Sequence, residues 1–98
     1  MKTNFNEIRE SEFQKLEFIL PVVKRVHGNS HPEIFEVVKV FDEINSKTAE
    51  ADKGALLLNN EFEQLRNITN NYTVPSGACE SYSAVYKSLK KVDNAYSQ

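Results

Sequence analysis

The chain has 98 residues, 27% of them charged, and a formal net charge of -2, so it holds one domain at most. This near-neutral balance lacks the strong positive field that nucleic-acid binding needs, and no apolar run is long enough to span a membrane. The first residues lack the apolar core of a signal peptide, and the single cysteine excludes an intrachain disulfide framework. We therefore expect a cytoplasmic protein with a modest core.

The first predicted helix covers about residues 5–27. Asn4 and Glu7 have the spacing of a capping box, Pro21 predicts a kink in the turn before it, and Gly28 suits the position after a helix end. Apolar residues recur at helical spacing: Phe5, Ile8, Phe13, Leu16, Ile19, Leu20, Val23 and Val26. We expect the other face to be solvated, with these charged side chains: Glu10, Glu12, Lys15 and Glu17.

A short corner at residues 28–33 leads into the second predicted helix, about residues 32–71. Apolar or small residues lie three or four apart along it without a slip: Ile34, Val37, Phe41, Ile44, Thr48, Ala51, Ala55, Leu58, Phe62, Leu65, Thr69 and Tyr72. This is the a/d pattern of a helix packed lengthwise against others. A helix of that length would span roughly 60 Å, whereas a compact domain of this size has a radius of gyration of about 13 Å. The helix therefore either breaks, near Gly54 or near Asn59 and Asn60, or extends beyond the monomer to meet a partner.

The last predicted helix covers about residues 77–97, with Ser76 as its N-cap after a break at residues 73–77. One side of it carries a continuous stripe: Cys79, Tyr82, Val85, Tyr86, Leu89, Val92 and Tyr96. No stretch alternates apolar and polar residues as a strand would, so we predict an all-α helical bundle that forms one domain over residues 1–98.

Several segments resemble the hemerythrin-like iron–sulfur cluster repair family. They are RVHG at 25–28, HPEI at 31–34, LRNITNNYTVP at 65–75 and GAC at 77–79, followed by Tyr86 and Leu89. The resemblance covers nearly the whole chain. It implies an up-down four-helix bundle that normally holds an oxo-bridged di-iron centre bound by His and Glu side chains.

The ligands of that centre are missing at the matching positions. Asn6 stands where the family has the His of its first helix, and Ala51 and Ala55 stand where the second helix has a His-x-x-x-Glu pair. The motif of the third helix is absent, and that of the fourth is due just past the last residue. The two histidines, His27 and His31, flank the corner, where we expect capping or interhelix hydrogen bonds rather than metal binding. We therefore expect no cofactor. An acidic group is interpreted as a solvated face: Asp42, Glu43, Glu50 and Asp52.

The family's loop between its second and third helices has no counterpart in the unbroken seam. Loss of a hinge loop favours domain swapping, so we expect a domain-swapped homodimer in which a long fused central helix completes two quasi-bundles. Its seam would include Ala51, Ala55, Leu58 and Phe62. The alternative is the compact monomer with a kink at Gly54.

Three functional hypotheses follow. The first is a non-catalytic, metal-free protein that acts by self-association or contact with a protein partner. The second is a retained role in iron–sulfur cluster repair, or in nitric-oxide and oxidative stress defence, with bound iron. The third is thiol chemistry at Cys79, near a helix N-terminus that would favour a thiolate; the competing interpretation is a packed thiol. No arrangement of nucleophile and base or phosphate-binding loop indicates an enzyme.

Overall fold

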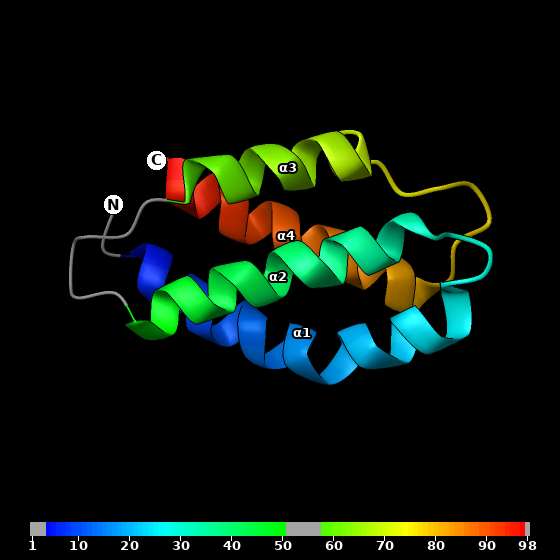
Figure 1. Cartoon of the computed structure of the whole chain (residues 1–98), viewed down its shortest axis with the longest axis horizontal. Coiled ribbons are helices and arrows are strands. Elements are labelled where there is room, and N and C mark those ends of the chain that lie inside the picture. The colour runs from blue at the N-terminus through cyan, green and yellow to red at the C-terminus, as the bar shows by residue number, and fades with distance from the viewer. Residues whose placement is uncertain (1–3, 51–57, 98) are drawn as a thin grey trace.

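The computed structural model describes residues 4–50 and 58–97, which form four helices. They are α1 (Asn4–His27), α2 (Glu33–Glu50), α3 (Asn59–Thr69) and α4 (Glu80–Ser97). Successive helices run antiparallel, so the beginning of α1 and the end of α4 lie at the same end of the bundle (Figure 1). α1 packs against α4 and α2, and α2 packs against α3. The all-α class is confirmed, and no strand occurs in the described ranges.

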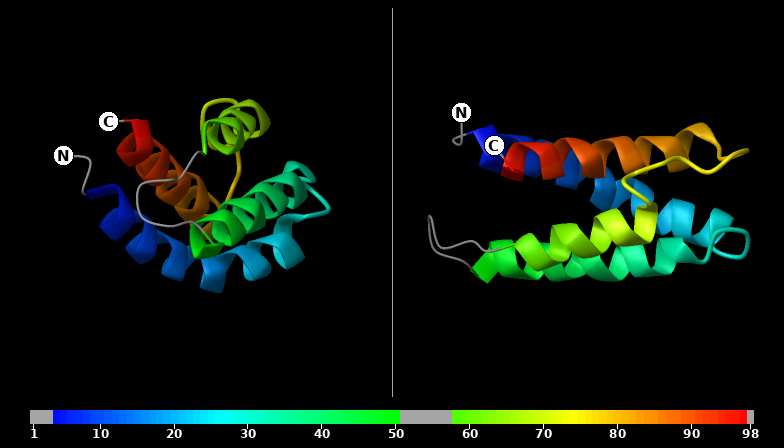
Figure 2. Two further views of the ribbon diagram at one scale, coloured as in Figure 1. Left: turned by 60° about the vertical axis from the view of Figure 1, so that its left-hand side comes forward. Right: turned by 90° about the horizontal axis from the view of Figure 1, so that it is seen from above.

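The single helix expected over residues 32–71 is wrong. α2 ends at Glu50, α3 begins at Asn59, and the two helices lie side by side (Figure 2). The longest dimension of the molecule is 38 Å, too short for a rod of roughly 60 Å. Ala51, Gly54 and Ala55 lie outside the described residues. The expectation of domain swapping rested on the fused helix, and the structure has two separate helices, α2 and α3, in its place.

The core explains how the seam accommodates this reversal. Residues of all four helices fill it, including Leu16, Val37, Phe62 and Val85, together with Leu58 just before α3, and each of these is 0% exposed. Leu58 and Phe62, expected at a dimer seam, are therefore buried within one protomer. An a/d seam points its apolar residues inward whether the next helix continues or folds back. None of the four helices is long and apolar enough to cross a membrane.

The corner after α1 depends on a glycine. The Gly28 amide donates a hydrogen bond of 3.0 Å to the Lys24 carbonyl, which closes the last turn. A Cβ atom at Gly28 would lie 2.5 Å from that carbonyl oxygen and 2.6 Å from the Phe35 ring, closer than real contacts allow. The chain can therefore turn from α1 into α2 here only without a side chain. The ribbon of α1 also bends along its length (Figure 1), as expected for a helix that contains Pro21.

The last helix begins later than the sequence predicts. Gly77 has a φ of +82°, in the left-handed region, and the Ala78 amide bonds to the Pro75 carbonyl at 3.2 Å. Residues 75–78 thus form a turn, so Ser76 is not an N-cap. α4 starts at Glu80, and Cys79 takes the position before it.

Glu12 was expected on a solvated face but is only 4% exposed, between α1 and α4. The Ser88 hydroxyl donates a hydrogen bond of 2.8 Å to one of its oxygens, and the ammonium groups of Lys15 and Lys91 lie 3.4 Å from the other. Burial raises the pKa of Glu12, but the bonds from Ser88 and Lys91 and the two lysine charges outweigh it. The net pKa is therefore below its ordinary value of 4.5.

This contact predicts a loss of stability in acid. Because the pKa of Glu12 is lower in the folded chain, its contribution is present above about pH 4.5 and is lost as the pH falls through the folded pKa. We expect Glu12→Gln to reduce the difference between the free energies of unfolding at pH 7 and pH 3, measured by urea denaturation. Glu43→Gln, at an exposed site on α2, is the control. Equal pH dependence in both variants would contradict the prediction.

Candidate functional site

Polar side chains from three helices meet at one end of the bundle, and we call this group the corner cluster: His27, His31, Glu33, Cys79, Tyr82 and Tyr86. Its central contact joins the end of α1 to the start of α4. The Nε2 atom of His27 lies 2.8 Å from the Sγ atom of Cys79, although 52 positions separate the two residues in the sequence. Cys79 is exposed and free. An exposed thiol beside an imidazole is an arrangement that supports thiolate chemistry.

Tyr82 forms the floor of the corner cluster. Its ring lies against both imidazoles, with centroid distances of 5.7 Å to His27 and 5.0 Å to His31. Its hydroxyl donates a hydrogen bond of 3.1 Å to a Glu33 oxygen and lies 3.0 Å from the Tyr86 hydroxyl. Burial raises the pKa of both tyrosines, and the bonds to Tyr86 and Glu33 raise that of Tyr82 further. The two hydroxyls are therefore neutral near pH 7.

The sequence located part of this cluster. His27 and His31 lie at the corner as expected, and His27 makes an interhelix contact. The packed interpretation of Cys79 is wrong, since the residue is exposed just before α4. Sequence reasoning missed the pairing of Cys79 with His27, because no spacing rule links residues so far apart. Tyr82 was predicted only as part of an apolar stripe.

The described residues do not fit a di-iron centre. Within residues 4–50 and 58–97, no three His, Cys, Asp or Glu side chains are placed to hold a metal ion. Inward positions along the middle of the bundle are apolar, as at Leu20, Phe41, Ile44 and Leu89. Of the replaced ligand positions, Ala51 and Ala55 and the side chain of Asn6 lie outside the described part.

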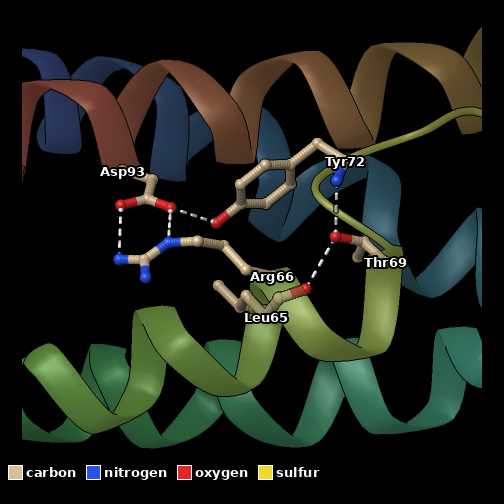
Figure 3. Close-up of polar contacts among 5 residues, drawn as sticks. All are labelled: Leu65, Arg66, Thr69, Tyr72 and Asp93. Carbon is tan, nitrogen blue, oxygen red and sulfur yellow. Dashed lines mark hydrogen bonds and ion pairs between the residues drawn. The ribbon is translucent and has the colours of Figure 1, made fainter.

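A second polar network ties α3 to α4 (Figure 3). Nε and Nη2 of Arg66 donate to the two carboxylate oxygens of Asp93 at 2.9 and 3.3 Å, and the Tyr72 hydroxyl donates to the same carboxylate at 2.7 Å. The Thr69 hydroxyl donates to the Leu65 carbonyl at 2.6 Å and accepts the Tyr72 amide at 2.8 Å. Burial and the bond to Asp93 raise the pKa of Tyr72, so its hydroxyl remains a donor.

This network holds an unusual backbone. Asn70, Asn71 and Tyr72 have φ values of 53°, 58° and 62°, which place three consecutive non-glycine residues in the left-handed region. Asn residues tolerate this region better than other non-glycine residues, and a Tyr there is strained. The side-chain contacts of Thr69 and Tyr72 therefore fix the exit from α3, at an energetic cost to the backbone.

The outer face of α1 carries apolar side chains that the core does not use. Phe18 is 85% exposed, Val22 is 41% exposed and Val26 is 62% exposed. Phe35, at the start of the neighbouring helix α2, is 44% exposed. Pro21, also exposed, lies one turn from Phe18 and shares an open groove with Phe35. We call Phe18, Pro21, Val22, Val26 and Phe35 the α1 outer patch.

Searches against family models, curated protein sequences and solved structures found no match to this chain.

Proposed function

We propose that this chain is a non-catalytic, metal-free helical protein that acts by associating with a second copy of itself. The observation that carries the proposal is the exposure of Phe18, at 85%, on the side of α1 opposite the core. A surface helix of a globular protein normally has one apolar face, and α1 has two. Contiguous exposed apolar side chains mark interaction sites.

The apolar interior supports the metal-free part of the proposal. Buried positions on the facing helices α2 and α4 hold the apolar residues Phe41, Ile44, Val85 and Leu89, each at most 3% exposed. The proposal thus describes a bundle related to the iron–sulfur repair proteins that serves as a binding scaffold. The resemblance of the segments at 25–28 and 65–75 is its sequence support.

Absolute mass and metal content test this function together. Multi-angle light scattering at micromolar concentration should give about twice the chain mass of 11.2 kDa. Protein purified from iron-supplemented culture should contain no stoichiometric iron. A clean monomer would contradict self-association, and one or two iron ions per chain would favour the competing role in iron–sulfur cluster repair or nitric-oxide and oxidative stress defence.

A second candidate function, thiol chemistry at Cys79, is favoured by the 2.8 Å contact with His27. If the thiol donates its proton to Nε2, an imidazolium forms beside the thiolate and stabilises it. The thiolate is the nucleophile in alkylation, disulfide exchange and oxidation. Exposure of Cys79 leaves it accessible to such reagents.

His27→Asn should slow the alkylation of Cys79 by iodoacetamide at pH 7 severalfold, because the thiolate loses its imidazole partner. His31→Asn is a matched control, since His31 belongs to the same corner cluster and its imidazole contacts Glu33 and the rings of His27 and Tyr82. Stopped-flow alkylation gives the rates. Equal rates in the two variants, or a wild-type rate equal to that of the unfolded chain in urea, would leave the thiol with no special function.

A further inference from the structure

We propose that two copies of this chain pair α1 against α1, antiparallel, about a twofold axis that passes close to Phe18. The inference rests on the proposed self-association and specifies its surface. Figure 2 shows that α1 runs along the outside of the bundle, with α2 and α4 on its inner side. Its outer face is therefore open to a second molecule.

The spacing of exposed residues on that face suits a helix pair. Six of them follow one another at alternating steps of four and three: Glu7, Ser11, Gln14, Phe18, Pro21 and Arg25. This is the seam of two helices packed lengthwise, and its apolar centre is Phe18 with Pro21 and Val22. The face of α1 turned toward the core holds Leu16, Leu20 and Val23, so the seam is a separate face.

Charge selects the antiparallel pairing. The first half of α1 presents Glu7 and Glu10, and the second half presents Lys24 and Arg25. Among the described residues, no ion pair involves any of these four. An antiparallel pair brings the acidic half of one copy to the basic half of the other, whereas a parallel pair would place like charges together.

The same charges argue against other occupants. An anionic membrane surface would attract the basic half of α1 but repel Glu7 and Glu10. An acidic peptide would leave those two carboxylates facing its own charge. A second copy satisfies both halves at once, because a twofold interface matches each residue with its counterpart on the other side.

The register with Phe18 on the axis accounts for the groove beside the outer patch. Pro21, Phe35, Gly28, Lys24, Arg25 and Asn29 line it. Glu7 and Asn29 each lie eleven positions from Phe18, so Glu7 of the second copy comes to this groove. Lys24 and Arg25 place positive charge along this groove, and the Lys24 ammonium group lies 5.7 Å from the centroid of the Phe35 ring. In the same register Arg25 lies beside Glu10 of the second copy.

Disulfide trapping tests the axis. In a Cys79→Ser background, Phe18→Cys should cross-link to itself on mild oxidation, because residues on a twofold axis face their own counterparts. Lys39→Cys in the same background is the control, at an exposed site on α2 away from the proposed seam. Efficient cross-linking at position 18 but not at 39 supports the pairing. Equal cross-linking at both sites contradicts it.

Dissociation constants from sedimentation equilibrium test the contacts. Phe18→Asp should raise the dimer dissociation constant about tenfold or more. Arg25→Glu should raise it severalfold, and Glu10→Arg together with Arg25→Glu should restore it. A wild-type monomer would overturn both this inference and the proposed function. A wild-type dimer that Phe18→Asp leaves unchanged, or that the charge swap fails to restore, would overturn the α1 pairing and leave self-association intact.

Discussion

Replacement of Tyr82 by Ala is expected to lower the free energy of unfolding by about 3–5 kcal/mol, the range for truncation of a buried aromatic side chain. Tyr82 is 0% exposed and contacts both imidazoles of the corner cluster. Since domains of this size are stable by roughly 5–15 kcal/mol, this loss is a large fraction of the total free energy of unfolding. Urea denaturation followed by circular dichroism measures the change.

Lys87→Ala, an exposed truncation on the same helix, is the matched control and should change the free energy of unfolding by no more than about 0.5 kcal/mol. A loss at Tyr82 no larger than this would show that the tyrosine does not pack as described. Tyr has a lower helix propensity than Lys, so the change in propensity acts against the loss expected at Tyr82 and cannot explain it.

Conservative variants separate the hydroxyl from the ring. Tyr82→Phe leaves the hydroxyl of Tyr86, a residue 1% exposed, without the partner 3.0 Å away, so it should cost about 1–3 kcal/mol. The double variant Tyr82→Phe/Tyr86→Phe removes both hydroxyls. Its loss in the free energy of unfolding should be smaller than the sum of the losses of the two single variants. Glu33 is partly exposed, so water can replace the bond that it loses.

The helices of this chain can be predicted from the sequence because they depend on local signals. The stop at Gly28 was predicted from residue type, and the second predicted helix was expected to end near residue 71; α1 and α3 end close to these positions, at His27 and Thr69. Asn70 adopts a left-handed conformation, with a φ of 53°, and its amide bonds to the Arg66 carbonyl. Helix ends of this kind depend on one or two residues, so they can be predicted from a single sequence.

The change of direction between α2 and α3 could not be predicted from the sequence. The seam keeps its phase through Ile44, Leu58 and Phe62, all of which are 0% exposed. Those residues bury the same faces whether the chain continues or folds back, so periodicity alone does not locate the turn. The compact alternative was the better prediction for the protomer, and its expected break point, Gly54, lies outside the described residues. What decided against a rod was the tertiary packing of α3 on α2.

Prediction of the candidate site from the sequence was limited by tertiary structure even more than prediction of the fold. Cys79 meets His27 only because the start of α4 lies beside the end of α1. Glu12 looked like one more charge on a solvated face until Ser88 and Lys91 of α4 were placed over it. Such pairs join residues far apart in the sequence, so topology must be known before chemistry can be assigned.

Asp93 provides the clearest case, because the predicted stripe of α4 passed over it between Val92 and Tyr96. It is 4% exposed, and its carboxylate binds the guanidinium of Arg66 through two hydrogen bonds and the hydroxyl of Tyr72 through a third. The Arg66 pKa is raised chiefly by its hydrogen bond to Asp93. A buried carboxylate of this kind stabilises the fold only while its donors are in place.

Asp93→Asn is therefore expected to destabilise the chain by about 2–3 kcal/mol, since Arg66 loses its counter-ion but is exposed enough to be partly rehydrated. Tyr72→Phe should cost about 1 kcal/mol, and the double variant should cost less than the sum of the single losses, because both changes affect the same hydrogen bond. Asp42→Asn, at an exposed site on α2, is the control for loss of a negative charge. Urea midpoints supply all four values. If Asp93→Asn matched Asp42→Asn, this network would not hold α3 against α4, and the left-handed backbone at Asn70, Asn71 and Tyr72 would have to be fixed by other contacts.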